Sequence, residues 1–433
     1  MSCVPSVLCS AEQYRAIEDV LEKTGGCVIY LPKADVSLRL GKDIFLDGNP
    51  RWGVTVLQDI TGSSQAVWRS TAPHRLAKEV LQEEITANLK DIQAYLARKT
   101  FAGLPPQKIA KAKIGSVVIC TIWLGEVLVH LVRQTKCPLG KGTFFKAEGM
   151  GVLDDQGRML DGCCAFLKPV SKDPKNLLSQ MVNRTESAAV RYCKALPHVH
   201  VDEVAFFNAE ETKGYLVAPL AEKSGIDLII EPKEMMQMFR DLARGLWDLH
   251  RIGYCSGDIK RANTLCFKGI WKLSDNVFKL RGTPSPLTQT IAYISPQHRE
   301  FLQHQFVHFY RGCQGLLDQC LPDLDHPDFA YDVKPEDEVF SLGICFIDVY
   351  FAPLKEGFPF PSKEIVEGIA FMINRMTGVD IRLFSTFREL MDVVDPVDPV
   401  LRDSRLGEAY FDPFKRPTAL EVAEYFREMH ARL

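Results

Sequence analysis

The sequence predicts an α+β protein with a small strand-rich lobe, a larger helical lobe after it, and an N-terminal α/β extension. Three observations predict this fold. Strand-like apolar runs dominate from about residue 111, helical spacing dominates after Pro232, and a linker, Gly103-Leu104-Pro105-Pro106, precedes both. We therefore expect three segments, namely residues 1–110, 111–220 and 221–433.

The composition is that of a globular protein: 433 residues, 46% hydrophobic and 25% charged. A net charge of −3 without any block of Lys and Arg argues against nucleic acid as a partner. Thirteen cysteines without a CxxC pair favour reduced thiols over disulfides or a zinc ribbon. The N-terminus lacks the basic start and apolar core of a signal peptide, which predicts a cytoplasmic location.

The extension has two helical signals and short strands between them. Ser10 and Gln13 resemble a capping box, and the run Cys27 to Leu31 predicts a strand. Further strand-like runs continue to about Val67. A second helix, starting near Pro73, is predicted by apolar residues at spacings of three and four: Leu76, Val80, Leu81, Ile85, Leu89, Ile92 and Leu96.

The apolar run from Ile114 to Val132 could be mistaken for a membrane span. Glu126 and His130 interrupt it and β-branched residues dominate it, so we expect buried strands and no transmembrane segment. The helical lobe opens with a clearer pattern. A helix after Pro232 that stops near Gly253 is predicted by one apolar face: Met235, Phe239, Leu242, Leu246 and Leu249.

The run Asp258-Ile259-Lys260-Arg261-Ala262-Asn263 carries the chemistry. Its aspartate and asparagine are separated by four residues, and a lysine lies between them. This run resembles the catalytic loop of eukaryotic protein kinases. The resemblance implies that Asp258 is the base for the incoming hydroxyl, that Asn263 binds magnesium, and that Lys260 neutralises the γ-phosphate, as in Ser/Thr kinases.

Upstream and downstream runs supply the other parts of that resemblance, which extends over residues 137–433. Ala165-Phe166-Leu167-Lys168 resembles the strand whose lysine holds the ATP phosphates, and Glu186, in a helical-looking segment from Leu177 to Leu196, is its expected ion-pair partner. Lys272-Leu273-Ser274-Asp275 resembles the strand that leads to the second magnesium ligand, Asp275. The resemblance implies ATP and Mg²⁺ as cofactors.

Further landmarks follow in the family's order. Tyr215-Leu216-Val217-Ala218-Pro219-Leu220 is similar to the strand and hinge that hold adenine, so Ala218, Pro219 and Ala221 are expected to line the nucleotide site. Three later runs resemble the end of the activation segment, the start of the buried central helix and the late arginine motif: Tyr293–Gln297, Val339–Gly343 and Asp412–Thr418.

The phosphate-covering loop departs from the family pattern. Gly140 and Gly142 are retained, but Phe145 replaces the third glycine. Because the backbone must approach phosphate closely there, a bulky side chain predicts weak nucleotide binding or none.

The residues around the two aspartates also depart from it. Ser256 and Gly257 replace the histidine and arginine before the base, and Asn276 and Val277 replace the phenylalanine and glycine after Asp275. We expect Ser256 and Asn276 to form a hydrogen bond that fixes the metal aspartate. Loss of the arginine predicts that activity does not depend on a phosphorylated activation loop.

Two further departures lie in the C-terminal segment. Gln297 replaces the glutamate that pairs with the late arginine, here Arg416, so a neutral partner is expected. An insertion at about 298–336 is expected to contain an extra helix for a partner or substrate. A metal site there, on His304, His308, Cys313 and Cys320, is the alternative.

Three functions remain open. A divergent protein Ser/Thr kinase fits the retained charged residues, and its partner would be a protein substrate or a regulatory protein. A pseudokinase that acts as a binding or allosteric scaffold fits the lost glycine, and a small-molecule kinase is the third alternative. A looser resemblance to the secreted rhoptry kinase-like proteins of apicomplexan parasites, many of which degrade the same loop, keeps a secreted location open.

Overall fold

The computed structural model describes a mixed α+β chain, which confirms the coarse fold class. Contacts divide it into two compact units. The sheet unit is Gly62–Ala195 with His200–Lys223, and the helical unit is Met1–Thr61, Leu196–Val199 and Ser224–Leu433. The described residues are 26–31, 36–44, 50–57, 81–97, 101, 103–124, 127–134, 138–141, 145–169, 185, 187–201, 203–210, 212–226, 231–285, 293–302, 304, 330–355, 362–394 and 405–433. The three segments expected from the sequence stay a prediction.

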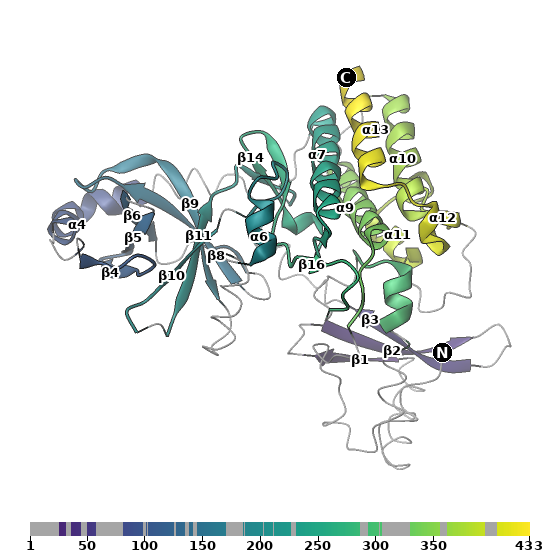
Figure 1. Cartoon of the computed structure of the whole chain (residues 1–433), viewed down its shortest axis with the longest axis horizontal. Coiled ribbons are helices and arrows are strands. Elements are labelled where there is room, and N and C mark those ends of the chain that lie inside the picture. Colours follow the sequence, from purple (N-terminus) through teal and green to yellow (C-terminus); the bar gives the residue numbers. More distant parts are fainter. Residues whose placement is uncertain are drawn as a thin grey trace, which may run out of the picture. The chain divides into compact units, whose positions relative to one another are not determined.

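The sheet unit is built on an eight-stranded sheet in which the paired strands run antiparallel (Figure 1). Its strand order is β10-β11-β9-β8-β6-β5-β4, and β7 pairs with β8. The strands are β4 (Ala110–Ile114), β5 (Val117–Leu124), β6 (Val127–Gln134), β7 (Pro138–Lys141), β8 (Phe145–Leu153), β9 (Met159–Pro169), β10 (Val204–Phe207) and β11 (Gly214–Pro219). The apolar run 114–132 therefore forms strands, as predicted, and no helix among the described residues is long and apolar enough to cross a membrane.

A helix covers one end of this sheet. Residues 81–87 are helical and lead into α4 (Leu89–Leu96). The predicted apolar stripe packs on β5 and β6, in a cluster that includes Leu81, Ile85, Ile92, Leu96, Val117, Ile119 and Val132. The helix predicted from its spacing is thus confirmed from residue 81 onward, and its start near Pro73 lies outside the described residues.

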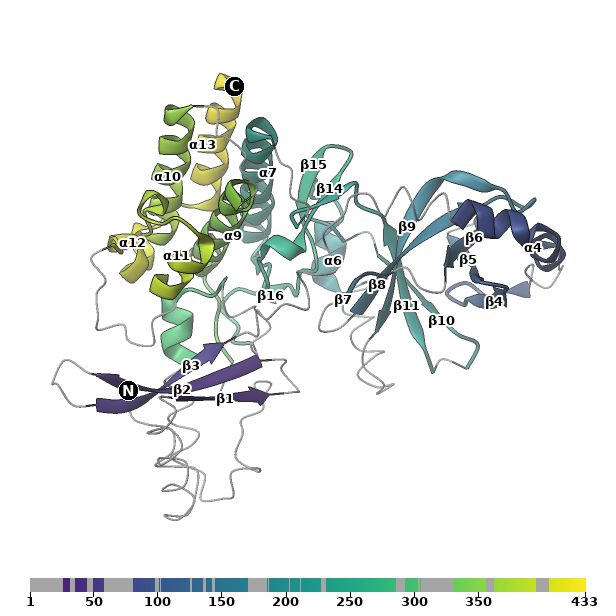
Figure 2. The ribbon, with the colours of Figure 1, turned by 180° about the vertical axis from the view of Figure 1, so that it is seen from behind.

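Four helices form the core of the helical unit: α7 (Pro232–Arg251), α9 (Pro335–Lys355), α10 (Lys363–Thr377) and α13 (Ala419–Arg432). They lie side by side in both views (Figures 1 and 2). Phe239, Phe346 and Phe426 join three of them, and the first two rings stack with centroids 4.0 Å apart. Shorter helices are α11 (Phe387–Val394), α12 (Glu408–Phe411), η6 (Ile381–Leu383) and η7 (Pro413–Lys415).

The helix expected after Pro232 is confirmed as α7. Its five predicted apolar positions are at most 1% exposed. The helix ends at Arg251, and the left-handed backbone of Gly253, with φ of 87°, turns the chain away. The expected buried central helix is confirmed as α9, in which Phe340 and Leu342 are fully buried.

Two small sheets shape the chain around the candidate catalytic loop. One contains β12 (Lys223–Ser224), β14 (Thr264–Phe267) and β15 (Ile270–Leu273), and the other pairs β13 (Tyr254–Cys255) with β16 (Lys279–Leu280). The turn η2 (Arg261–Asn263) leads into β14. The candidate catalytic loop is therefore held between a helix end, a hairpin and a two-stranded ribbon.

The N-terminal segment contains an antiparallel three-stranded sheet of β1 (Gly26–Leu31), β2 (Val36–Ile44) and β3 (Pro50–Leu57). The strand predicted at residues 27–31 is confirmed as part of β1. The helix expected after Ser10 lies outside the described residues, as do residues 58–80.

The helix expected from Leu177 to Leu196 ends earlier than predicted. Its described part is α6 (Ala188–Cys193), whose N-cap Ser187 accepts a hydrogen bond from the backbone N–H of Val190. A serine in extended conformation that accepts such a bond is typical of a helix N-cap. Glu186 and residues 170–184 lie outside the described residues.

Candidate functional site

The expected catalytic loop brings its three charged or amide side chains together. Lys260 Nζ donates to Asp258 Oδ2 over 2.7 Å, and Asn263 Nδ2 donates to the same oxygen over 3.0 Å. Asn263 Nδ2 also donates to the Asp258 carbonyl over 2.9 Å. The carboxylate of Asp258, which is 7% exposed as a residue, is therefore fixed in orientation by two donors from its own loop.

The second acidic residue lies at the same end of the β14–β15 hairpin as Asn263. Thr264 pairs with Leu273 in this hairpin, so Asn263 and Ser274 are opposite each other just beyond it. Ser274 donates to the Asn263 carbonyl from its backbone N–H over 2.8 Å and from Oγ over 2.9 Å. Asp275 follows directly, exposed and with a φ of 52°. This left-handed backbone conformation, uncommon for a residue other than glycine, ends the strand conformation at Asp275.

The predicted hydrogen bond between Ser256 and Asn276 is confirmed. Ser256 Oγ donates to Asn276 Oδ1 over 2.6 Å, and Asn276 Nδ2 donates to the Leu273 carbonyl over 3.1 Å. The carbonyl of Ser256 accepts the backbone N–H of Val277 over 2.8 Å. Two of these bonds tie Asn276 and Val277, which follow Asp275, to Ser256 in the loop before Asp258, and the third holds Asn276 to the end of β15.

Glu338 belongs to the candidate site, although the sequence did not predict it. It is fully buried at the start of α9, where its Oε2 accepts the backbone N–H of Ser256 over 3.0 Å and its Oε1 that of Gly257 over 2.8 Å. His250 Nε2 lies 3.0 Å from Oε2. One carboxylate therefore anchors the backbone just before Asp258 to the central helix. The sign of Glu338 in the sequence is its position immediately before the Val339–Gly343 run.

The same carboxylate belongs to the one potential metal-ligating group found among the described residues. His250, Cys255 and Glu338 each offer a donor atom, and these atoms lie within 4.8 Å of one another. Each of the three already has a partner within the protein. His250 Nε2 faces Glu338 Oε2, and the thiol of Cys255 can donate to the Val333 carbonyl, which lies 3.5 Å away. Burial also raises the pKa of that thiol, so we assign the group to anchoring.

Lys168, the expected phosphate-binding lysine, lies near the end of β9 in the sheet unit. Its Nζ is 2.6 Å from Oε2 of Glu148, and Arg133 Nε is 2.9 Å from the same oxygen. Burial lowers the pKa of Lys168, an effect that the bond to Glu148 opposes. The expected pairing with Glu186 stays a prediction, because Glu186 lies outside the described residues.

Glu148 is a second residue that the sequence did not predict. Its side chain is 5% exposed and faces two cations from neighbouring strands. The sequence of β8 alone does not show that Glu148 is a buried charge with partners, because the compensating groups come from β6 and β9.

The residues expected to hold adenine and cover the phosphates lie in the sheet unit. Ala218 and Pro219 are the last residues of β11, and Ala218, which is 5% exposed, pairs with Ala165 of β9. Ala221 follows this strand at a partly buried position. Gly140 belongs to β7 and pairs with Ala147 of β8, whereas Gly142 lies outside the described residues.

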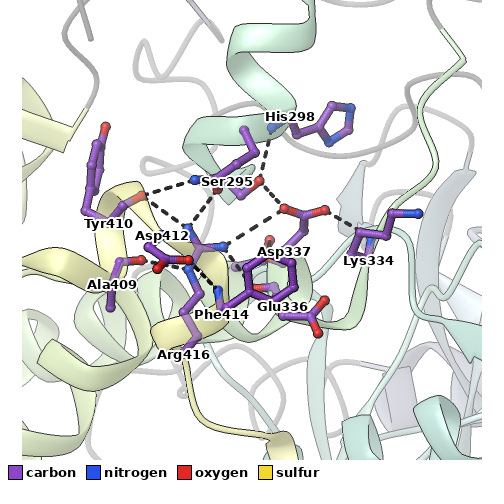
Figure 3. Close-up of polar contacts among 12 residues, drawn as sticks. Ser295, His298, Lys334, Glu336, Asp337, Ala409, Tyr410, Asp412, Phe414 and Arg416 are labelled. Carbon is purple, nitrogen blue, oxygen red and sulfur yellow. Dashed lines mark hydrogen bonds and ion pairs between the residues drawn. The ribbon is translucent and has the colours of Figure 1, made fainter. Parts of the chain in front are cut away.

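The late arginine motif forms a buried network in the helical unit (Figure 3). Arg416 donates to the carbonyls of Ala409 and Glu336 over 2.8 and 3.1 Å, and its Nη2 donates to Gln297 Oε1 over 2.8 Å. The predicted neutral partner at position 297 is thus confirmed. A carboxylate, Asp337, lies 4.0 Å from Nη1, and burial lowers the pKa of Arg416 to about 10.

The expected thiol state is confirmed where the structure describes it. Cys120, Cys193, Cys255, Cys266 and Cys345 are buried and unbridged. In the insertion, His304 is described, but His308, Cys313 and Cys320 lie outside the described residues, so the alternative metal site there stays a prediction.

The structure therefore brings Asp258, Lys260 and Asn263 into one cluster and puts Asp275 at the end of the adjoining hairpin, all in the helical unit. Lys168, Ala218 and Pro219 lie in the sheet unit. Comparison of the sequence with protein-family models and with curated proteins finds no match.

Proposed function

We propose that the chain is a divergent protein Ser/Thr kinase, which transfers the γ-phosphate of ATP to protein hydroxyls. The observation that carries the proposal is the hydrogen-bonded cluster of Asp258, Lys260 and Asn263, joined by Ser274 to the hairpin that ends in Asp275. Phosphoryl transfer needs a carboxylate for the hydroxyl proton, a cation for the phosphate, and oxygen ligands for magnesium. This cluster offers all three within one loop and one hairpin.

In this proposal Asp258 orients the substrate hydroxyl and accepts its proton. The two donors on Oδ2 fix the plane of the carboxylate, so it approaches the hydroxyl from one direction. Lys260 carries a positive charge to the same place, where it stabilises charge on the transferring phosphoryl group. A lysine at this position favours Ser and Thr over Tyr as acceptors.

The donor set also suits magnesium, which prefers carboxylate and amide oxygens. Both hydrogen bonds of the Asn263 amide to Asp258 come from Nδ2, so Oδ1 is the amide atom that can coordinate a cation. Asp275 adds a carboxylate from the other side of the hairpin end. When bound, magnesium neutralises charge on the ATP phosphates. Ser256 and Asn276 hold the Asp275 backbone in place for that contact.

The role proposed for Lys168 is to hold the α- and β-phosphates. Its side chain is 25% exposed, and its ammonium lies 2.6 Å from Glu148 Oε2. Glu148 keeps that ammonium charged and in position in the absence of nucleotide. We further propose that the sheet unit and the helical unit are the two lobes of a protein-kinase-like fold, and that residues 1–110 are an appended segment.

A pseudokinase is the second candidate, and two observations favour it. Phe145, which replaces the third glycine of the phosphate-covering loop, begins β8. Glu148 competes with a phosphate for Lys168, because it already neutralises the ammonium at 2.6 Å. In this alternative the two units bind a protein partner, and no phosphate is transferred.

A thermal-shift titration with ATP and Mg²⁺ separates the two candidates. If the chain binds the nucleotide, saturation raises the Tm of the wild-type protein by about 5 °C or more. Lys168→Ala is expected to abolish that shift. Lys363→Ala is the matched control, because the Lys363 side chain is 88% exposed on α10, and it should keep the shift. No shift at millimolar ATP would support the pseudokinase.

A further inference from the structure

A buried lysine lies beside the candidate base without belonging to the kinase resemblance. Lys279 opens β16 and pairs with Cys255 of β13, two residues before Gly257. It is only 5% exposed. Lysine is rarely buried to this extent without an electrostatic reason, so its surroundings need an explanation.

Gly257 provides the space that this lysine fills. Its φ is 85°, and a Cβ added there would lie 3.1 Å from Val277 Cβ and 3.3 and 3.4 Å from Cγ and Cε of Lys279. A larger residue at 257 would therefore be strained by its backbone conformation and would crowd these neighbours. The position just before Asp258, which carries an arginine in the kinase motif, has no side chain here, and the stem of Lys279 packs against it.

The charged and titratable groups that face Lys279 come from four elements. Asp258 of the loop and Glu338 of α9 attract the ammonium, and Cys255 of β13 lies beside it. The imidazole of His298 is the fourth. It is completely buried and stacked on Tyr331 at 4.0 Å, and burial lowers its pKa far below the ordinary range, so it is neutral.

The surroundings also affect the protonation of the lysine itself. Burial lowers the pKa of Lys279 to about 8, while Glu338 and Asp258 oppose that change. The ammonium thus carries its charge at neutral pH at a cost in stability, because removing it from water outweighs the attraction. A buried charge with such a cost points to a role in the site rather than in packing.

We propose that Lys279 is a positioning residue for Asp258, a built-in cation that replaces the arginine absent at Gly257. Its side chain links the segment after Asp275 to the loop before Asp258 by attraction to Asp258 and Glu338. In the kinase family that arginine reads a phosphorylated loop. Here the cation belongs to the segment itself, so the link needs no phosphate. The proposal rests on the proposed kinase function and adds how its site is assembled.

A double-mutant cycle tests the contact without any need for activity. Lys279→Met, Asp258→Asn and the double variant are compared with wild type by thermal unfolding at pH 7. Because the two side chains interact, their effects on Tm should deviate from additivity by about 2 °C or more. The cycle of Lys363→Met with Asp258→Asn should be additive. Additive effects in the Lys279 cycle would overturn the proposal.

The pH dependence separates a charged role from a packing role. The folded pKa of about 8 is below the ordinary 10.5, so the folded state is penalised at pH 7. This penalty is relieved as pH rises through 8. Wild type should therefore gain Tm relative to Lys279→Met between pH 7 and 9. A Tm difference between wild type and Lys279→Met that stays constant from pH 7 to 9 would mean that Lys279 only fills space.

Activity gives the third readout. Phosphate transfer by wild type should fall above about pH 8 as Lys279 loses its proton, and Lys279→Arg should remove that fall. If the protein transfers no phosphate but the cycle is non-additive, the Lys279 contact is supported and the proposed kinase function is refuted. If the protein transfers phosphate and the cycle is additive, the proposed kinase function is supported and the Lys279 contact is refuted.

Discussion

Replacing Glu338 by glutamine would leave the shape of the central anchor unchanged and remove its charge. The carboxylate accepts the backbone N–H groups of Ser256 and Gly257 over 3.0 and 2.8 Å, and it faces His250 Nε2 at 3.0 Å. A glutamine amide has only one accepting oxygen, so its NH₂ group must point at one of the two backbone N–H groups. That group would lose its partner in a fully buried position.

The expected loss follows from these contacts. A hydrogen bond to a charged group contributes about 1.5–3 kcal/mol and a neutral one about 0.5–1.5 kcal/mol, while an unsatisfied buried donor costs about 1–3 kcal/mol. Loss of one bond and weakening of another give a decrease of about 3 kcal/mol in the free energy of unfolding. The Tm should therefore fall by about 6–12 °C.

Urea denaturation and thermal unfolding measure this loss, and Glu424→Gln on the exposed face of α13 is the matched control. Amide hydrogen exchange adds spatial detail. In Glu338→Gln the amides of Ser256 and Gly257 should lose protection, whereas amides in the α10 helix should keep theirs. A Tm within about 1 °C of the control, with unchanged protection, would refute the anchoring role of Glu338.

Three further predictions concern other contacts. Glu148→Gln leaves two cations facing each other across β8, and it should lower the free energy of unfolding by about 2 kcal/mol in a urea titration, since one cation is partly exposed; an unchanged midpoint would contradict the ion pair. Ser256→Ala removes the donor to Asn276 and should cost about 1 kcal/mol by the same assay, and equal stability would show that water replaces it. Gly378→Ala, where a Cβ would lie 2.3 Å from a backbone nitrogen, should cost about 3 kcal/mol or more, whereas Gly253→Ala, with open space and a similar φ, should cost about 1 kcal/mol. Equal losses of unfolding free energy for these two glycine variants would mean that backbone strain alone, and not contact of the added Cβ, causes the loss.

Local patterns predicted the elements whose apolar faces are regular. The α7 stripe and the helix over β5 and β6 were correct because a spacing of three and four residues is required to bury one helix face. The end of the helix near residue 193 was misjudged. Its apolar spacing continues to Leu196, but the chain leaves the helix after Cys193.

The residues of the candidate site also fall into those that the sequence predicts and those that it does not. Asp258, Lys260 and Asn263 could be predicted because they are close in sequence, and the paired replacement of Ser256 and Asn276 suggested their hydrogen bond. Glu338, Glu148 and Lys279 could not, because the partner that explains each one is supplied by a distant segment. A buried charge has no signature in its own neighbourhood until the compensating charge is placed beside it.

The most direct test of the proposed function is the rate of γ-phosphate transfer from radiolabelled ATP to a mixed Ser, Thr and Tyr peptide library, measured for wild type and Asp258→Asn. If Asp258 is the base, wild type should label Ser and Thr peptides but not Tyr peptides, and Asp258→Asn should reduce the rate by about 10²–10⁴-fold. Equal rates in the two proteins, or no transfer by wild type under conditions where ATP raises its Tm, would contradict the assignment of Asp258 as the base.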